Sequence, residues 1–178
     1  MNPLHQLQQK IEELDLWERD FKPLRNEYIK VAGSIDTNIY FVKEGSLRIF
    51  VVDKEEELTI RFAYKYNFVA ALDSYISQQP SDLYIQALKK SQLKVIGKKK
   101  FMDFIFSNKE NLKLWHVILE QLVFQQMERE RDLLTSSPSE RYQRVLQTSP
   151  QLFQEIPNRY IASYLRMTPE TLSRLKKS

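Results

Sequence analysis

Residues 157–178 read PNRYIASYLRMTPETLSRLKKS, and this stretch decides how the chain is organised. Its apolar spacing fits two short helices joined by a tight turn at Arg166-Met167. Thr168 is a favourable N-cap for the second helix, and Pro169 suits its first position. The pattern predicts a helix-turn-helix. Its inner face would be formed by Ile161, Ala162, Leu165, Leu172 and Leu175.

The second helix then leaves a polar row facing outward, with groups that can bind DNA. Arg174 can form paired hydrogen bonds with guanine, and Glu170 can accept one from cytosine. Other basic side chains would neutralise phosphates. An ordinary helical hairpin with a solvated charged face has the same spacing, so spacing alone leaves both interpretations open. The predicted DNA-binding residues are Arg159, Thr168, Glu170, Thr171, Ser173, Arg174, Lys176 and Lys177.

The charge balance changes just before this stretch. Ser137-Pro138-Ser139-Glu140 has capping-box spacing, which predicts a helix start, and Ser149-Pro150 predicts another. From Ser139 onward there are seven basic and three acidic residues, whereas residues 1–138 hold 20 of each. The formal net charge of +4 therefore lies entirely in the last forty residues. This asymmetry favours a polyanionic partner for the C-terminal end.

Upstream of that boundary, residues 111–134 form a predicted long helix with an apolar heptad stripe. Ile118, Val123, Phe124 and Met127 widen the apolar surface beyond one seam. Such a helix should bury one face on its own domain and another on a second copy of the chain. Packing inside a monomer alone is the alternative. The predicted dimer interface comprises Leu112, Trp115, Leu119, Leu122, Gln126, Arg129 and Leu133.

The first hundred residues follow a different period. After an amphipathic helix over residues 4–20, short β-branched and aromatic segments recur every 10–15 residues. This spacing favours an antiparallel barrel or jelly roll. In the third segment, Leu58, Ile60 and Phe62 alternate with polar residues, as in a half-buried strand. The predicted strands are Ile39–Val42, Leu47–Val52, Leu58–Ala63, Phe68–Leu72, Tyr84–Leu88 and Leu93–Ile96.

Ile161–Leu165 followed by Thr168–Arg174 closely resembles the helix-turn-helix of Crp/Fnr-type bacterial transcription regulators. Tyr40–Arg48 and Glu57–Phe62 are similar to the cyclic-nucleotide-binding-type β-roll of that family, and Leu72–Ser81 is similar to its Bacteroidetes-type members. The resemblance implies an α+β fold: an N-terminal antiparallel β-roll (a double-stranded β-helix or jelly roll), a long dimerisation helix and a C-terminal all-α helix-turn-helix domain. The expected domain bounds are 1–110, 111–136 and 137–178.

The resemblance also implies a function: a homodimeric, cytoplasmic transcription regulator that binds palindromic double-stranded DNA. A small-molecule effector and RNA polymerase are further expected partners. The alternative is a ligand sensor whose helical end contacts a protein. Because the chain has no cysteine, and only the distant pair His5 and His116, we expect no metal site. We find no nucleophile–base arrangement, no secretory signal and no membrane-length apolar run, so we expect neither an enzyme nor a membrane protein.

Two departures from the family pattern affect these expectations. Family members that bind cyclic AMP use a Gly-Glu-Leu turn and an Arg-Ser or Arg-Thr pair, but here Ala70-Ala71-Leu72 and Pro80-Ser81 stand instead. Without a guanidinium for the phosphate, we expect no cyclic AMP and an unidentified effector. The inter-helix turn has Arg166 where glycine is usual. The predicted effector pocket comprises Ala70, Ala71, Leu72, Ser74, Ser81 and Tyr84.

Overall fold

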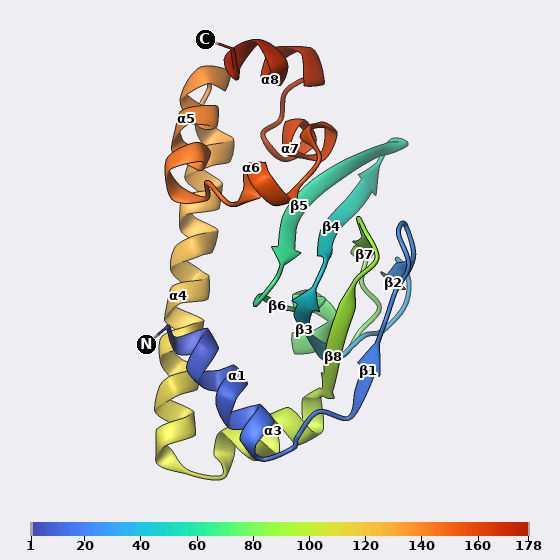
Figure 1. The fold of residues 1–178 in the computed structure, drawn as a ribbon, viewed down its shortest axis with the longest axis vertical. Helices are drawn as coiled ribbons and strands as arrows, with labels where there is room; N and C mark the ends of the chain where they lie inside the picture. Colours follow the sequence, from blue (N-terminus) through green and yellow to red (C-terminus); the bar gives the residue numbers. More distant parts are fainter. Residues whose placement is uncertain (1, 178) are drawn as a thin grey trace.

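The computed structural model describes residues 2–177, so the outermost predicted domain bounds, 1 and 178, lie outside the described residues. The chain forms a β-roll at one end, a long helix along one side and a cluster of short helices at the other end (Figure 1). No helix within residues 2–177 is long and apolar enough to cross a membrane. The helices are α1 (Pro3–Glu13), α2 (Leu72–Ser77), α3 (Lys98–Phe106), α4 (Lys109–Leu134), α5 (Pro138–Thr148), α6 (Leu152–Glu155), α7 (Asn158–Tyr164) and α8 (Pro169–Leu175).

The roll consists of two four-stranded antiparallel sheets, ordered β1-β8-β3-β6 and β2-β7-β4-β5. Apolar side chains from both sheets, among them Val42, Leu47, Ile85 and Val95, meet in a core that excludes water. This arrangement confirms the predicted antiparallel roll. The strands are β1 (Arg19–Phe21), β2 (Tyr28–Lys30), β3 (Asn38–Glu44), β4 (Ser46–Asp53), β5 (Glu56–Tyr64), β6 (Phe68–Val69), β7 (Tyr84–Ala87) and β8 (Gln92–Gly97).

Two of the predicted elements are wrong at their ends. The helix expected over residues 4–20 stops at Glu13, because Asp15 adopts a left-handed backbone (φ 49°). Arg19–Phe21 then pairs with β8, so a sheet partner overrides the helical spacing. The strand expected over residues 68–72 ends at Val69, and the chain forms α2 from Leu72. The sequence analysis missed β1, β2 and α2, which are too short to establish a period.

The residues of β5 that point inward also differ from those that the alternating sequence pattern predicts. Its register against β4 shifts by one residue, so that Ile49 pairs with Arg61 while the next residue, Phe50, pairs with Thr59. The intervening Ile60 is therefore bulged and 38% exposed, whereas Thr59 is buried. A bulge reverses the faces on its two sides. Arg61 consequently turns toward the interior side of the roll rather than outward.

Helix starts follow the capping residues closely. The Ser137 hydroxyl accepts from the Glu140 N–H at 3.3 Å, and the Thr168 hydroxyl accepts from the Thr171 N–H at 3.2 Å. Both predicted N-caps are confirmed. Ser149 does not begin α6; it ends α5, and its N–H donates to the Val145 carbonyl. A Ser-Pro pair thus marks a boundary here without capping the following helix.

Candidate functional site

Helices α7 and α8 are joined by a turn held from inside by one arginine. Arg166 takes a left-handed backbone (φ 54°), a conformation that costs a residue with a side chain roughly 1 kcal/mol. The buried Arg141 of α5 donates to the carbonyls of Leu165 (2.9 Å) and Arg166 (3.1 Å). The same guanidinium donates to the carbonyls of Thr135 (2.6 Å) and Ser136 (3.0 Å). Arg141 therefore links the turn to the segment between α4 and α5.

Helix α8 presents a polar row on its outer side. Leu172 is fully buried and anchors the helix on α7, which forces the opposite face outward. A shallow hollow lies along this face, and it is lined by Pro169, Glu170, Ser173, Arg174 and Lys177. Backbone and Thr168 hydroxyl hydrogen bonds lower the pKa of the Glu170 carboxyl, which keeps it ionised. The row thus combines an acceptor, a hydroxyl and two cations on one exposed surface.

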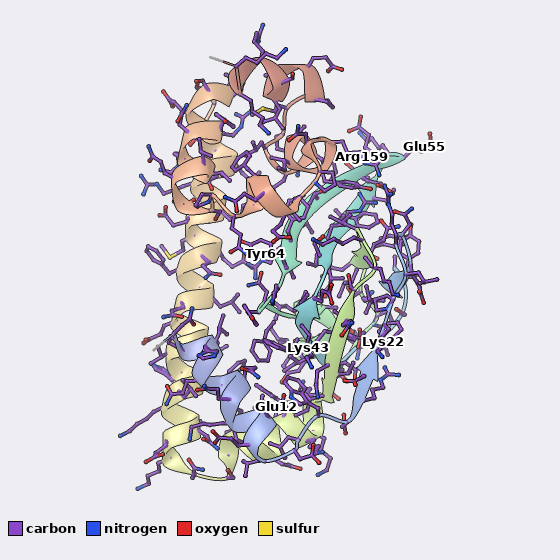
Figure 2. All side chains as sticks on the ribbon, in the orientation of Figure 1. Glu12, Lys22, Lys43, Glu55, Tyr64 and Arg159 are labelled. Atoms are coloured by element: carbon purple, nitrogen blue, oxygen red, sulfur yellow. The ribbon has the colours of Figure 1, made fainter. Side chains whose placement is uncertain are left out.

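The remaining predicted DNA-binding residues lie around this row. Thr168 is exposed, and Thr171 is half-buried beside it. Lys176 donates to Asn158 Oδ1 at 3.0 Å, which places it between α8 and the start of α7. Arg159 lies apart: it stacks on the Tyr160 ring and projects toward Glu55 at the tip of the β4–β5 hairpin (Figure 2).

Helix α7 docks directly on strand β5 of the roll (Figure 1). The Ser163 hydroxyl accepts from the Thr59 N–H (3.2 Å) and donates to the Glu57 carbonyl (3.1 Å). The rings of Phe62 and Tyr164 meet at 5.5 Å. This contact continues the apolar core of the C-terminal helices onto the roll, and it sets the orientation of α7 and α8 relative to the roll.

Arginines also fasten the C-terminal helices to α4. Arg129 donates to the Tyr164 carbonyl at 2.6 Å and lies over the Tyr164 ring at 3.5 Å. Arg144 pairs with Asp132 (2.7 Å) and Glu128 (3.2 Å) of α4. Arg141 and Arg144 belong to the basic excess of the C-terminal end, yet both bind protein groups. The positive charge available on the surface of this end is therefore smaller than the sequence count suggests.

The seven predicted dimer residues of α4 divide between two faces. Trp115 packs edge-on against Phe101, Leu122 and Gln126 line a cavity, and Arg129 binds Tyr164. These four lie on the side of α4 that faces their own chain, which α1, α3 and the roll flank along one part and α7 along another. Leu112, Leu119 and Leu133 are exposed, and their role in a dimer stays a prediction.

Beside them lies an exposed apolar stripe that the sequence analysis treated only as a widening of the seam. Phe124 is 64% exposed, and the stripe continues along the solvent side of α4. Such a row on one helix face is unusual for a surface in contact with water. We define the α4 stripe as Val117, Val123, Phe124, Met127 and Leu134.

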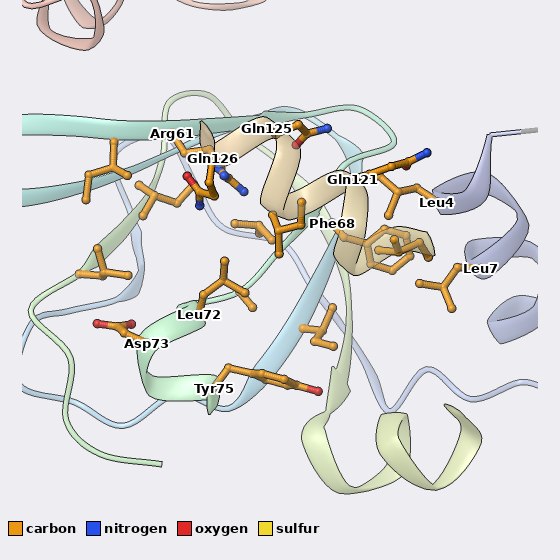
Figure 3. A pocket seen from close by; sticks show the side chains of 18 of the residues that line it. Leu4, Leu7, Arg61, Phe68, Leu72, Asp73, Tyr75, Gln121, Gln125 and Gln126 are labelled. Atoms are coloured by element: carbon orange, nitrogen blue, oxygen red, sulfur yellow. The ribbon is translucent and has the colours of Figure 1, made fainter. Parts of the chain in front are cut away.

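A largely apolar cavity of about 400 Å³ lies between the roll, α1 and α4 (Figure 3). Its apolar lining residues include Leu7, Phe68 and Ile118, and its polar lining residues include Arg61 and Tyr75. The sequence analysis missed both of these polar residues. The alternating pattern of β5 gave no signal for Arg61, because the bulge that turns it inward arises only in the folded sheet.

Only Ala70 and Leu72 of the predicted effector-pocket residues line this cavity. The other four lie outside it and make contacts within the roll, and their part in an effector pocket stays a prediction. Ala71 is fully buried in the roll core, and the Tyr84 ring stacks on Phe50 at 5.0 Å. The Ser74 hydroxyl donates to the Gln79 carbonyl, and the Ser81 hydroxyl accepts from the Leu83 N–H.

A buried lysine holds the segment around Ser81 in place by hydrogen bonds. Lys30 Nζ donates to the carbonyls of Val31 (2.9 Å), Ser81 (2.9 Å) and Leu83 (2.7 Å). Three carbonyls use all three ammonium donors. Burial lowers the pKa of Lys30. Lys30 therefore holds this loop and has no donor left for a bound phosphate.

Comparison with known proteins agrees with this architecture. Residues 22–108 match the sequence family described as "Cyclic nucleotide-binding domain". The Catabolite Activator Protein of Thermus thermophilus superposes with TM-score 0.60 and 18% identity, over 99% of this chain and 85% of the other. FixK2 of Bradyrhizobium japonicum superposes with TM-score 0.71 and 17% identity, over 89% and 82%.

A third solved structure is the regulator CLP of Xanthomonas campestris, described as responsive to c-di-GMP. It superposes with TM-score 0.69 and 15% identity, over 96% of this chain and 90% of the other. No curated protein sequence matches the chain. Residues 22–108 thus match a cyclic nucleotide-binding domain, and the fold of the chain is similar to that of the Catabolite Activator Protein and FixK2. Membership of the Crp/Fnr family, and of its Bacteroidetes-type subgroup, stays a prediction.

Proposed function

We propose that the protein is a homodimeric, cytoplasmic transcription regulator that reads palindromic DNA through α8 and responds to an effector other than cyclic AMP. The observation that carries this proposal is the exposed polar row of α8, which Leu172 fixes on a capped, docked helix. A row of this chemistry at the end of a helix-turn-helix suits a major groove. RNA polymerase would be the partner through which binding alters transcription.

The residues of the row divide by role. Arg174 would make paired hydrogen bonds with guanine, and Glu170 would accept from cytosine. Thr171 and Ser173 would contact a base or a phosphate. Lys176 and Lys177 would neutralise phosphates of the DNA. Arg159, near the start of α7, would do the same where this end of the helix faces the DNA backbone. Such contacts position the domain, while the two base readers select the sequence.

A second copy of the chain would pack on the α4 stripe. Two-fold symmetry would then pair Phe124 and Met127 with the same side chains of the partner helix. The two α8 helices would have to lie about 34 Å apart to enter successive major grooves. An effector that moves the segment held by Arg141 would change this separation, and with it the DNA affinity.

Salt dependence of binding to a generic duplex tests the proposal. A DNA-binding protein should lose affinity steeply, with a log–log slope near −0.9 for each phosphate contacted. The titration is run on the full chain and on the Lys176→Gln/Lys177→Gln variant. Its slope should be shallower by about 4, because two lysines are lost from each copy of the dimer. A flat response would support instead a ligand sensor whose helical end contacts a protein.

A further inference from the structure

We propose that the cavity between the roll and α4 binds an amphipathic monoanion, a carboxylate on an apolar body, with Arg61 pairing with the anionic group. This inference rests on the proposed function, since it names the chemical class of the effector. It places the effector against α4 and β5, beside the predicted pocket residues Ala70 and Leu72.

The negative charge proposed for the ligand follows from the positive charge of Arg61, which has no counter-charge within the described chain. Other arginines in the interior have partners: Arg48 pairs with Glu57 at 2.5 Å, and Arg141 donates to four backbone carbonyls. Among residues 2–177 no carboxylate pairs with Arg61 and no carbonyl accepts from it. Burial lowers the pKa of Arg61, yet a guanidinium stays charged at neutral pH. A half-buried cation without a counter-charge favours an anion beside it.

The apolar body follows from the rest of the lining. Leu4, Leu7, Phe68, Trp115 and Ile118 surround the space. A cavity of about 400 Å³ lies in the range that holds small organic ligands. Asp73 lines the cavity away from Arg61 (Figure 3), and its carboxylate would repel a second negative charge. A single anionic group at the Arg61 end is therefore the charge pattern that fits.

Two further polar groups support an occupant of this kind. The hydroxyl of Tyr75, a residue 7% exposed, has no hydrogen-bond partner within the described chain. The ring lines the cavity on the side opposite Arg61 (Figure 3). Burial raises the pKa of Tyr75 to about 12, so the hydroxyl remains a donor. Gln126 of α4 projects toward the Arg61 end (Figure 3), where its amide can donate to the same carboxylate.

The location also explains how such a ligand would be sensed. Arg61 and Ile60 line the cavity, and their neighbours Thr59 and Phe62 contact Ser163 and Tyr164 of α7. A carboxylate that draws Arg61 toward it would act on β5 at the point where α7 docks. The cavity and the helix-turn-helix thus share one strand.

Calorimetric titration of the full chain with matched probes tests this inference. Octanoate, octan-1-ol and octylammonium share one apolar body and differ in charge, and 3-phenylpropionate with 3-phenylpropan-1-ol provides an aromatic pair. We expect each carboxylate to bind at least tenfold more tightly than its alcohol. Arg61→Gln should remove this preference, Arg61→Lys should retain it, and Arg19→Gln, at an exposed arginine of β1, should leave it unchanged.

Contrary results are equally specific. Equal affinity for acid and alcohol, preference for the ammonium, or no heat with any probe would overturn the inference. If a probe binds in a way that depends on Arg61 and also dissociates the dimer, the cavity is normally filled by side chains of the second copy. That result would overturn the inference as well. Duplex binding is measured separately: carboxylate binding without DNA binding refutes only the proposed function, and DNA binding without carboxylate binding refutes only this inference.

Discussion

The β-roll and the C-terminal helices are held together by different means. The roll has two hydrogen-bonded sheets around a continuous apolar core, in which Val42, Leu47 and Ile85 are essentially inaccessible to water. The helices have a core of their own, which includes Phe62 and Leu88 of the roll. Their connection to α4 relies on hydrogen bonds from Arg129, Arg141 and Arg144.

This difference shows which part of the molecule can move. Shifting a strand within the roll would break a ladder of backbone hydrogen bonds and open the core. Shifting the helices would break a limited set of side-chain hydrogen bonds, which water can partly replace, and the apolar contacts with Phe62 and Leu88 of the roll. The C-terminal helices can therefore be reoriented at lower cost than the strands of the roll, which the proposed ligand control of DNA binding would require.

The most severe test of this comparison is Arg141→Met. The variant leaves four backbone carbonyls without their donor, so we expect the C-terminal helices to lose about 4 kcal/mol of stability. Hydrogen exchange should accelerate for the amides of α7 and α8, while amides in β7 and β8 stay protected. Lys177→Met, at an exposed lysine, serves as control. Loss of protection across the roll as well would show that the two regions unfold as one unit.

The next test addresses the helix that both regions share. Phe124→Glu places a charge on the α4 stripe of both copies, which should weaken the dimer by about 3 kcal/mol. Sedimentation velocity gives the dimer dissociation constant. Lys43→Glu, at an exposed position of β3 away from α4, provides the control. A dimer that survives Phe124→Glu would refute the stripe as the interface.

A third test concerns the outward face of α8. Arg174→Ala should reduce affinity for the preferred duplex by about 1–3 kcal/mol and relax selectivity at one base position. Selection from a random duplex pool, compared between wild type and variant, measures both effects. The helices should remain folded, since Arg174 is exposed. Equal weakening on every sequence would make Arg174 a phosphate contact instead of a base reader.

The smallest effect is expected at the surface link between the two regions. Lys89 and Glu155 pair at 2.9 Å in partly exposed positions, where an ion pair contributes at most about 1 kcal/mol. Lys89→Ala should therefore change neither the unfolding midpoint nor the DNA affinity measurably. A marked loss of either would mean that this pair, and not the docking of α7 on β5, sets the position of the helices.

Local signals in the sequence predict much of the fold. Ser137 and Thr168 cap the helices that they were expected to cap, because an N-cap needs only its own hydroxyl and a backbone N–H three residues on. The tight turn between α7 and α8 lies at Arg166-Met167 as expected, while the left-handed backbone of Arg166 (φ 54°) is known only from the structure. The antiparallel roll follows from strand length and turn spacing, and the exposed row of α8 from helical geometry around Leu172.

The side of an element that a residue faces, and the group with which it pairs, depended on residues far apart in the sequence. Arg61 lines the cavity because β5 carries a bulge against β4, and no pattern within β5 announces it. Arg141 and Arg144 belong to a basic segment, but folding brings carbonyls and carboxylates to them that remove them from the surface. Trp115 and the α4 stripe lie on the same helix. Only the packing of α1, α3 and the roll against α4 decides which of its sides is exposed to solvent.

The amino-acid sequence by itself therefore determined the order of the elements, the two helices α7 and α8 with the turn between them, and the outward residues of α8, since these depend on neighbours within a few positions. The tertiary structure alone decided where the apolar cavity lies and which charges are already paired. A charged group's partners are set by distances in space, and distant segments come within hydrogen-bonding range only when the sheets and helices pack.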